Sequence, residues 1–400
     1  MKKLKQLMVK NKFFEYIIYF VFNLVNFLLY IVSFIMSVLP IQQNKIVCCN
    51  MKGKRYGDNP KYISDKLLQQ HKNYDIVWLI KNIENEKPID GIRYVKYGSF
   101  QMLRELVTAK VWIDSNSKMP GLHKRKSQYY IQTWHGSYGL KKVYGDIEDK
   151  VSLIDKKFIK SNSKIQDLMV SNSKFYSDIM RRAFWYDGEI IEKGSPRNDI
   201  FFEDATSYRK KVLKYFGLTD ENIILYAPTY RNDMELNRYD VNFEKILECA
   251  EKKFGGKWVM FVRLHPHNLK DAEKFITYND RVINASGYDV MQELLVAADI
   301  LISDYSSCMF DFITKPKPCF IYATDRDKYK KERDYYFELE ELPFPIAETS
   351  KQLEYNIAHF DNDNYVKNVK KLFDRVKLNE TGKSSHIIAN RVISIIEGEE

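Results

Sequence analysis

Short apolar runs alternate with amphipathic stretches along most of the chain. The short runs are bounded by Gly, Pro, Asn or Asp, a pattern that predicts buried strands. We expect strands at Lys45–Cys49, Asp75–Ile80, Ile92–Val95, Val111–Asp114, Tyr129–Thr133, Ile190–Lys193, Ile223–Tyr226, Trp258–Val262, Val282–Asn284, Ile300–Ser303 and Pro318–Ile321. Helical stretches lie between most of them, for example at Phe100–Ala109, Ser173–Arg182, Val241–Phe254 and Val290–Ala298. Strands that alternate with helices predict a doubly wound α/β fold.

A longer apolar run precedes this pattern. Ile17–Leu39 comprises 23 positions without a charge, and as a helix it would be about 35 Å long, enough to cross a bilayer. It is too long for a secretory signal peptide, and no small-residue cleavage site follows it. Residues 1–40 are therefore predicted to be a membrane-associated segment. Lysines flank both of its ends, so charge indicates no orientation, and the segment either spans the membrane or lies in its plane with the lysines on anionic headgroups.

The best domain boundary lies near Ser195–Thr206, where Gly194, Pro196 and Asp199 interrupt the pattern. A chain of 400 residues is comfortable for two α/β domains. We expect them at 41–203 and 204–400. Ligands of such domains bind in a cleft at the carboxyl ends of the strands.

Net charge and cysteine content limit the classes of protein and partner that fit the sequence. The net charge of +10 suits an anionic partner such as an acidic membrane or a phosphate-rich substrate, although a codon bias toward Lys and Asn would produce the same balance. The basic residues form no aromatic-interleaved cluster, so no nucleic acid is expected. The five cysteines include no CxxC pair, which argues against zinc and disulfide frameworks and fits a reducing cytoplasm.

His135 and Gly136 close a predicted strand in the run Gln132-Thr133-Trp134-His135-Gly136. A neutral imidazole at a strand end is able to take a proton from a hydroxyl near neutral pH. Lys141 and Lys142 follow and are candidates to meet phosphate. A structural His that caps a turn is the alternative.

Arg263 and His265 close another strand, before Pro266. At a period of two they point to the same side, and two cations together suit a pyrophosphate. The alternatives are hydrogen bonds to backbone carbonyls and, for His265 with His267, a metal pair. No carboxylate cluster accompanies the pair, so no metal is expected.

Three further polar turns are candidates for phosphate contact. Ser306 and Ser307 follow Asp304 at a predicted helix start, where amides and hydroxyls hold phosphate or simply cap the helix. Thr229 and Arg231 follow a strand and the turn at Pro228, and Arg is suited to forked phosphate contact. The last pair is Arg197 and Asn198, at the inferred hinge.

These motifs occur in the order TWHG, GSPRND, LYAPTYR, RLHP and ISDYSS with MFDF. In that order the chain resembles the CDP-glycerol glycerophosphotransferase family of teichoic acid synthesis, over roughly Ile113 to Arg391. The resemblance implies α/β architecture of the GT-B type: two Rossmann-like domains facing a cleft, the final helix crossing back to the first domain. One departure is Ser137-Tyr138 after Gly136, where the family often has Thr-Pro, and another is Ser195 in a hinge that commonly begins Gly-Tyr-Pro or Gly-x-Pro. These departures leave the identity of the substrate open.

The resemblance implies a role for each residue that matches a motif of the family. The resemblance implies His135 as the general base on the acceptor hydroxyl, with Gly136, Lys141 and Lys142 on the acceptor side. It implies His265 near the donor phosphates. Donor contacts are expected from Thr229, Arg231, Arg263, Asp304, Ser306, Ser307, Arg197 and Asn198.

The implied reaction transfers glycerol phosphate from CDP-glycerol, a substrate and not a cofactor, to a lipid-linked or polymeric acceptor and releases CMP. CDP-ribitol is the nearest alternative donor, a nucleotide sugar is a more distant one, and a non-catalytic membrane scaffold is a third interpretation. Because CDP-activated donors are cytoplasmic, the resemblance implies the inner face of a bacterial membrane, with an anionic membrane surface as a partner.

Overall fold

The computed structural model describes residues 12–70, 72–136, 139–229, 241–264, 276–326, 328–329 and 334–399. The chain divides into two compact units. Unit 1 comprises Met1–His135, Val143–Arg197 and Asn379–Glu400, and unit 2 comprises Gly136–Lys142 and Asn198–Leu378. The division thus falls at Arg197, shortly before the predicted boundary at 203, and the last segment of the chain belongs to unit 1.

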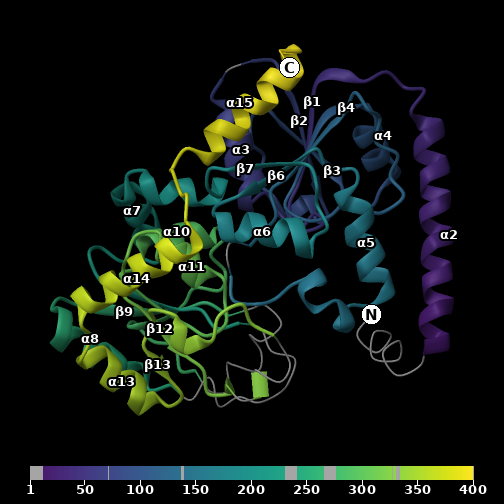
Figure 1. Ribbon diagram of the computed structural model, residues 1–400. Coiled ribbons are helices and arrows are strands. Elements are labelled where there is room, and N and C mark those ends of the chain that lie inside the picture. Colours follow the sequence, from purple (N-terminus) through teal and green to yellow (C-terminus); the bar gives the residue numbers. More distant parts are fainter. Residues whose placement is uncertain are drawn as a thin grey trace. The chain divides into compact units, whose positions relative to one another are not determined.

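Unit 1 is built on a parallel sheet of seven strands in the order β3-β2-β1-β4-β5-β6-β7 (Figure 1). The strands are β1 (Gln42–Cys49), β2 (Asp75–Ile80), β3 (Ile92–Lys96), β4 (Ala109–Asp114), β5 (Tyr129–Gln132), β6 (Leu168–Ser171) and β7 (Glu189–Glu192). After β3 the chain returns to the other side of β1. The carboxyl ends of β1 and β4 therefore form the topological switch point, where ligands of open α/β sheets bind.

Alternate residues of the strands in unit 1 feed two separate cores. On one face, Ile46 and Cys48 pack with residues of α3 (Asp58–Leu68) and α15 (Ser384–Glu397). On the other, Val47 and Cys49 pack with residues of α4 (Phe100–Thr108). Because successive side chains of a strand point to opposite faces, a strand covered on both sides is apolar throughout. This explains why the strands read as continuous apolar runs.

The other helices of unit 1 are α2 (Lys12–Met36), α5 (Leu153–Ser163) and α6 (Lys174–Ala183). Short 3-10 turns occur at Ile83–Asn85, Tyr144–Lys150 and, starting at the end of this unit, Pro196–Phe202. Ser173 caps α6 by accepting a hydrogen bond from the amide of Tyr176, so the predicted helix start is confirmed there.

Unit 2 holds a parallel sheet of six strands in the order β10-β9-β8-β11-β12-β13. The strands are β8 (Asn222–Tyr226), β9 (Trp258–Val262), β10 (Val282–Asn284), β11 (Ile300–Ser303), β12 (Cys319–Tyr322) and β13 (Ile346–Ala347). The helices are α7 (Ala205–Tyr215), α8 (Phe243–Phe254), α10 (Met291–Ala297), α11 (Cys308–Phe312), α13 (Ser350–Ala358) and α14 (Asn362–Val376), with a 3-10 turn at Leu339–Glu341. Its switch point lies between β8 and β11.

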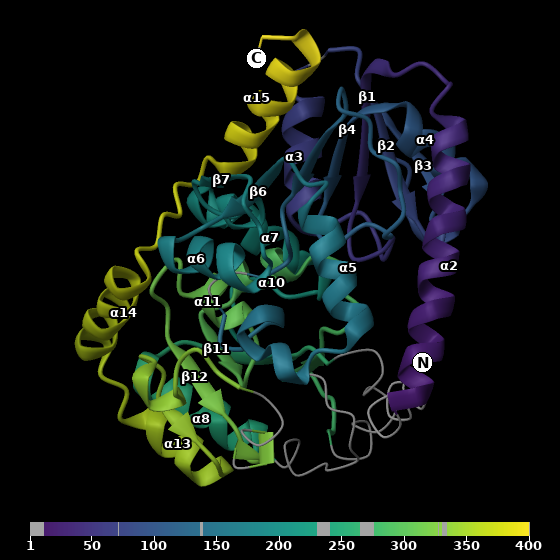
Figure 2. The same ribbon diagram turned by 45° about the vertical axis from the view of Figure 1, so that its right-hand side comes forward.

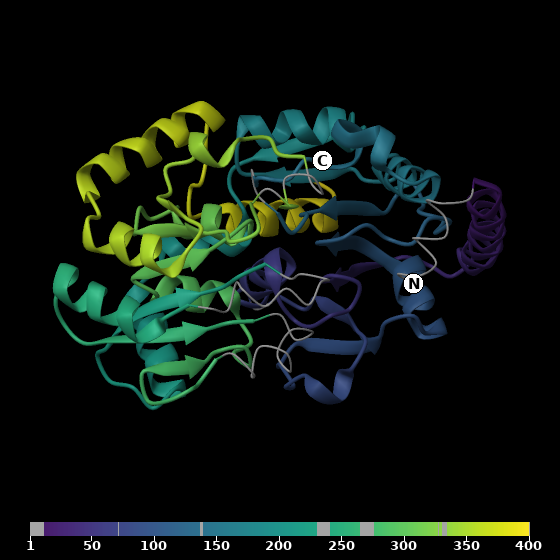
Figure 3. The same ribbon diagram turned by 90° about the horizontal axis from the view of Figure 1, so that it is seen from below.

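Helix α2 runs along the side of unit 1 beside α4 and α5 (Figure 2). Seen from below, it lies at the outer edge of the unit (Figure 3). Glu15–Met36 is long and apolar enough to cross a membrane, and only 6% of its most apolar window is buried. Among the described side chains of α2, fourteen large apolar ones are exposed, by 37% at Ile31 to 70% at Phe13. Such a surface is typical of contact with lipid or protein and not with water.

All of the predicted strands are confirmed, with ends that differ by a few residues at most. The pattern missed β6 and β13. Strand β13 has two residues, which is too short for apolar periodicity to reveal. Strand β6 has four residues, the same length as the predicted strand β11, so its length does not explain why the pattern missed it. The predicted helices at 100–109, 173–182, 241–254 and 290–298 correspond to α4, α6, α8 and α10.

Candidate active site

His135 follows β5 and lies at the carboxyl edge of the unit 1 sheet, beside the end of β4. Its Nδ1 atom is 2.7 Å from the backbone oxygen of Ser115. A carbonyl oxygen only accepts hydrogen bonds, so Nδ1 carries the proton and Nε2 of the neutral ring keeps its lone pair. The side chain is thus oriented as a proton acceptor, as a general base requires.

The protonation equilibrium of His135 favours the same role. Burial lowers the pKa of His135 below its ordinary 6.5, although the Ser115 carbonyl and the Asp58 carboxylate act in the opposite direction. Arg197 adds to the lowering because its positive charge disfavours an imidazolium. The ring is therefore neutral at pH 7.

Arg197 and the start of α3 hold the backbone around His135. The Nη1 atom of Arg197 donates to the His135 oxygen at 2.7 Å and pairs with Asp58 at 2.9 Å. The Asn59 side chain donates to the Trp134 oxygen at 2.9 Å and accepts from the Arg197 amide at 3.0 Å. Trp134 has a φ of 53°, a left-handed conformation that a bulky residue rarely adopts. These bonds fix the strained turn that presents the imidazole.

A buried ion pair lies in the turn that follows β4. Lys118 and Asp114 pair at 2.9 Å with side chains only 4% exposed. Asp114 also accepts from the amide of Asn116 at 2.8 Å. The pair thereby closes the turn that carries the Ser115 oxygen. Ser115 is itself tied to β1 because its hydroxyl donates to Asn50 at 2.9 Å.

The residues expected on the acceptor side belong to unit 2, although they follow His135 in the chain. Gly136 begins this segment. Lys141 forms an isolated bridge with Tyr335, and its Nζ atom lies 5.2 Å from the centre of the Tyr329 ring. The amide of Lys142 donates to the Asp334 oxygen at 2.9 Å. Both lysines are therefore anchored through their backbone.

Asp304 and Thr229 meet at the switch point of unit 2. Thr229 follows β8 and donates to Asp304 from its amide at 2.8 Å and from its hydroxyl at 2.5 Å. The same carboxylate oxygen accepts from the Tyr305 amide at 2.6 Å. The geometry therefore joins two motifs that are far apart in the sequence and predicted to contact the donor.

Ser306 and Ser307 precede α11, as predicted. Ser307 is the residue before the helix, and the Ser306 hydroxyl accepts from the Cys308 amide at 3.4 Å. In α11, Asp311 is 2% exposed and accepts from the Asn198 side chain at 3.2 Å. Asn198 therefore has a contact in the interior of unit 2.

Arg263 has a backbone partner for its guanidinium. Its Nη1 atom donates to the oxygens of Tyr288 at 2.6 Å and Ala285 at 3.3 Å. This is the alternative that the sequence left open, and it links the end of β9 to the loop after β10. The predicted residues His265 and Arg231 lie outside the described residues.

Sequence reasoning did not single out Asp58, Asn59, Ser115 or the Asp114–Lys118 pair. Asn59-Pro60 was the available signal for the first two, because Pro in the first turn and a polar residue before it mark a helix start after the first strand of such a fold. In the described part of the chain, no group of three His, Cys, Asp or Glu side chains is placed to hold a metal ion.

Two doubly wound parallel sheets, each with polar side chains at its switch point, define a protein of two Rossmann-like domains of the GT-B type. The structure of a histidine-to-alanine variant of the wall teichoic acid polymerase TagF matches with a TM-score of 0.80 at 29% identity, over 90% of this chain and 91% of that one. The chain belongs to the CDP-Glycerol:Poly(glycerophosphate) glycerophosphotransferase family, whose model matches residues 31–394.

Curated relatives share this similarity. The chain is 31% identical to the teichoic acid poly(glycerol phosphate) polymerase of Staphylococcus epidermidis, over 88% of this chain and 51% of that protein. It is 30% identical to the teichoic acid glycerol-phosphate transferase of Staphylococcus aureus, over 86% of this chain and 89% of that protein. A teichoic acid poly(ribitol-phosphate) polymerase of Bacillus spizizenii is 26% identical, over 82% of this chain and 54% of that protein. The chain spans about half the length of the polymerases from Staphylococcus epidermidis and Bacillus subtilis.

Proposed function

We propose that this protein transfers glycerol phosphate from CDP-glycerol to a hydroxyl of a teichoic-acid-type acceptor and releases CMP. The observation that carries the proposal is the orientation of His135, whose Nδ1 is bonded to the Ser115 oxygen and whose Nε2 remains a proton acceptor. Family membership supports the substrate class. A structure of a TagF histidine variant soaked with CDPG, 28% identical to this chain, supports the donor.

In the proposed mechanism, Nε2 of His135 takes the proton of the acceptor hydroxyl. The acceptor oxygen then bonds to the β-phosphorus of CDP-glycerol, the bond from that phosphorus to the bridging oxygen breaks, and CMP leaves with the bridging oxygen. Positioning and fixed charge stabilise the transition state, and no covalent intermediate with the protein is needed.

The donor is assigned to unit 2. Thr229, Asp304 and the two serines before α11 bring hydroxyl and amide groups to one switch point, where phosphates of nucleotide ligands bind in such sheets. The resemblance adds His265 and Arg231 as cations for the pyrophosphate. Arg263 is proposed to link the end of β9 to the loop after β10 and not to contact the donor directly, since its guanidinium already bonds two backbone oxygens of that loop.

CMP release from CDP-glycerol and CDP-ribitol, each with a lipid-linked acceptor, tests the function. Acceptor-dependent release from CDP-glycerol alone is expected. Preference for CDP-ribitol would replace the donor and keep the mechanism; the match to a ribitol-phosphate polymerase makes this the second candidate. If folded protein released no CMP from either donor, the proposal would be contradicted.

The protein is also proposed to be attached to the membrane by α2 lying in the membrane plane. Unit 1 contacts the helix along its length. Glu15 accepts from the Leu153 amide at 3.1 Å, Ser33 accepts from the His123 amide at 3.0 Å, and the Ser37 oxygen accepts from Arg125 at 2.9 Å. A helix of 25 residues is about 37 Å long. If α2 crossed the bilayer, these contacts would draw unit 1 into the hydrocarbon.

Protease protection of tags at the two ends of the chain tests this topology in spheroplasts. An in-plane helix on the cytoplasmic face protects both tags until the membrane is opened. A spanning helix exposes one tag and not the other, and that result would overturn the in-plane proposal.

A further inference from the structure

A pocket of about 360 Å³ lies at the junction of α2 and α5. Tyr19 comes from α2, and Leu153, Lys156, Lys157, Lys160, Ser161 and Lys164 come from α5 and its end. The lining thus contains four lysines and no carboxylate. Its volume falls in the range of about 300–1,000 Å³ that is typical of small-molecule sites. The chemistry of this lining favours an anion.

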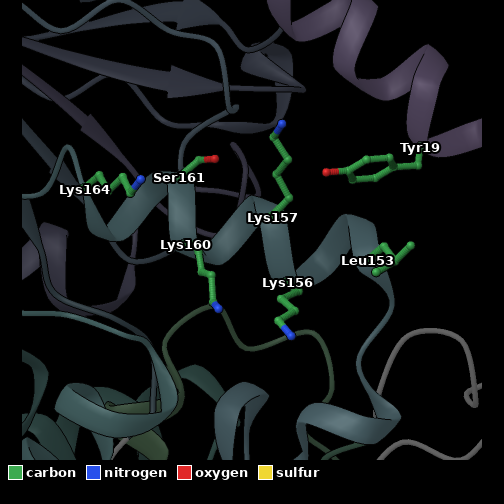
Figure 4. A pocket seen from close by; sticks show the side chains of 7 residues that line it. All are labelled: Tyr19, Leu153, Lys156, Lys157, Lys160, Ser161 and Lys164. Atoms are coloured by element: carbon green, nitrogen blue, oxygen red, sulfur yellow. The ribbon is translucent and has the colours of Figure 1, made fainter. Parts of the chain in front are cut away.

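The lysines are not equivalent. Lys156 forms an ion pair with Glu148, and Lys160 lies over the Trp185 ring, 4.4 Å from its centre. Lys157, Ser161 and Lys164 share one face of α5, because residues three and four apart are neighbours on a helix. Figure 4 shows Lys157 and Ser161 extending to one side of α5 and Lys156 and Lys160 to the other, with Tyr19 facing α5 from α2. Lys157 and Lys164 are exposed.

The surroundings of the pocket are apolar. Tyr16, at 60% exposure, and Phe20, at 69%, flank Tyr19 on α2, and Leu153 at the start of α5 is 38% exposed. A lysine face beside an apolar helix matches the boundary between lipid headgroups and acyl chains, where apolar side chains enter the membrane and basic side chains meet phosphate.

We propose that the pocket at the junction of α2 and α5 binds the phosphate headgroup of an anionic membrane phospholipid, with Lys157 and Ser161 contacting the phosphate. Lys164 extends the positive surface toward neighbouring headgroups. The inference rests on the proposed membrane attachment of α2 and adds lipid selectivity, which the apolar surface of α2 alone would not supply. Ammonium and hydroxyl groups accommodate any phosphate, but the adjoining apolar helix favours a lipid over a soluble anion.

Vesicle flotation of the full chain, diluted from detergent, tests this. The variant Lys157→Gln/Lys164→Gln is compared with Lys252→Gln/Lys253→Gln, which removes the same charge from exposed positions of α8 in unit 2. Each basic residue near an anionic surface contributes roughly fivefold to binding, so we expect about 30-fold weaker partitioning of the first variant onto phosphatidylglycerol-containing vesicles at low salt. The control should bind like the wild type. CMP release in detergent should be equal in all three proteins.

The possible results separate the two proposals. If Lys157→Gln/Lys164→Gln bound anionic vesicles as well as the wild type does, the headgroup site would be overturned. The site would also be overturned if the control variant lost as much binding as Lys157→Gln/Lys164→Gln does. If soluble poly(glycerol phosphate) displaced wild-type protein but not the variant, the site would take polymer and not lipid. Wild type that binds neutral and anionic vesicles equally would leave the attachment by α2 intact and overturn the headgroup site alone. Wild type that floats with neither vesicle would overturn the membrane attachment as well.

Discussion

The two units present polar residues at equivalent places in their sheets but build them differently. In unit 1, a single imidazole is held by a buried network of charges: Arg197 with Asp58, and Lys118 with Asp114. In unit 2, Asp304 accepts hydrogen bonds from Thr229, which is far away in the sequence, and from Tyr305, the next residue in the chain. One site depends on the exact placement of one ring, whereas the other gathers hydroxyl and amide groups.

The difference matches the two tasks proposed for them. Proton transfer requires the correct distance and angle between one donor atom and one acceptor atom. Residues that hold the imidazole rigidly in place therefore support it. Holding a diphosphate requires several donors, each of modest strength. Disrupting unit 1 should therefore reduce turnover or folding, and disrupting unit 2 should weaken donor binding.

The largest effect is expected for Lys118→Met. Removing one partner of a buried ion pair leaves an uncompensated charge, which costs about 3–5 kcal/mol of stability. Denaturant unfolding measures the loss. The double variant Asp114→Leu/Lys118→Met should recover at least part of it, because two apolar residues leave no buried charge. Unchanged stability of the single variant would show that the pair does not support the turn that follows β4.

His135→Asn comes next. Loss of the base should lower kcat by about 10² or more, as is typical of general bases, while the dissociation constant of CDP-glycerol stays within a factor of about three. Single-turnover CMP release and donor titration measure the two quantities. His359→Asn, a change at the end of α13 in unit 2, is the control. A retained kcat would exclude His135 as the base.

Thr229→Val should have the opposite signature. The change removes the hydroxyl bond to Asp304, and a hydrogen bond to a charged group contributes about 1.5–3 kcal/mol. We expect the KM for the donor to rise about tenfold or more with little change in kcat. Thr219→Val removes a surface hydroxyl that bonds to Asp220 and should change neither value. A loss of kcat alone would place Thr229 in the chemical step instead.

The smallest effect concerns pH. Because burial lowers the pKa of His135 below 6.5, kcat/KM should fall as pH decreases through that lower pKa, where the base becomes protonated, and level off at higher pH. Asp58→Asn removes a charge that raises this pKa, so the fall should move to still lower pH. A pH profile of both proteins checks the sign, and a shift to higher pH would contradict it.

The apolar pattern alone predicted most of the fold, because strands buried on both faces and amphipathic helices leave strong local signals. It missed β6 and β13, which are held by neighbours in their sheets and not by their own few residues. The motifs predicted His135 and the residues around Asp304 as a site. What the motifs could not reveal is which cations are available: Arg197 and Arg263 read as phosphate ligands, yet their guanidinium groups bond Asp58, the His135 oxygen and the oxygens of the loop after β10.

The two α/β domains, the apolar helix at the amino terminus and the polar turns that end the strands could be predicted from local sequence, since each depends on residues close together in the chain. The position of the proton on His135, the partners of Arg197 and Arg263 and the contact of Lys157 with α2 follow from the folded structure alone. Those depend on contacts such as His135 with Ser115, or Tyr19 with Lys157, between residues far apart in sequence. Local sequence does not predict such contacts, because they form only when the packing of the sheet and helices brings distant segments together.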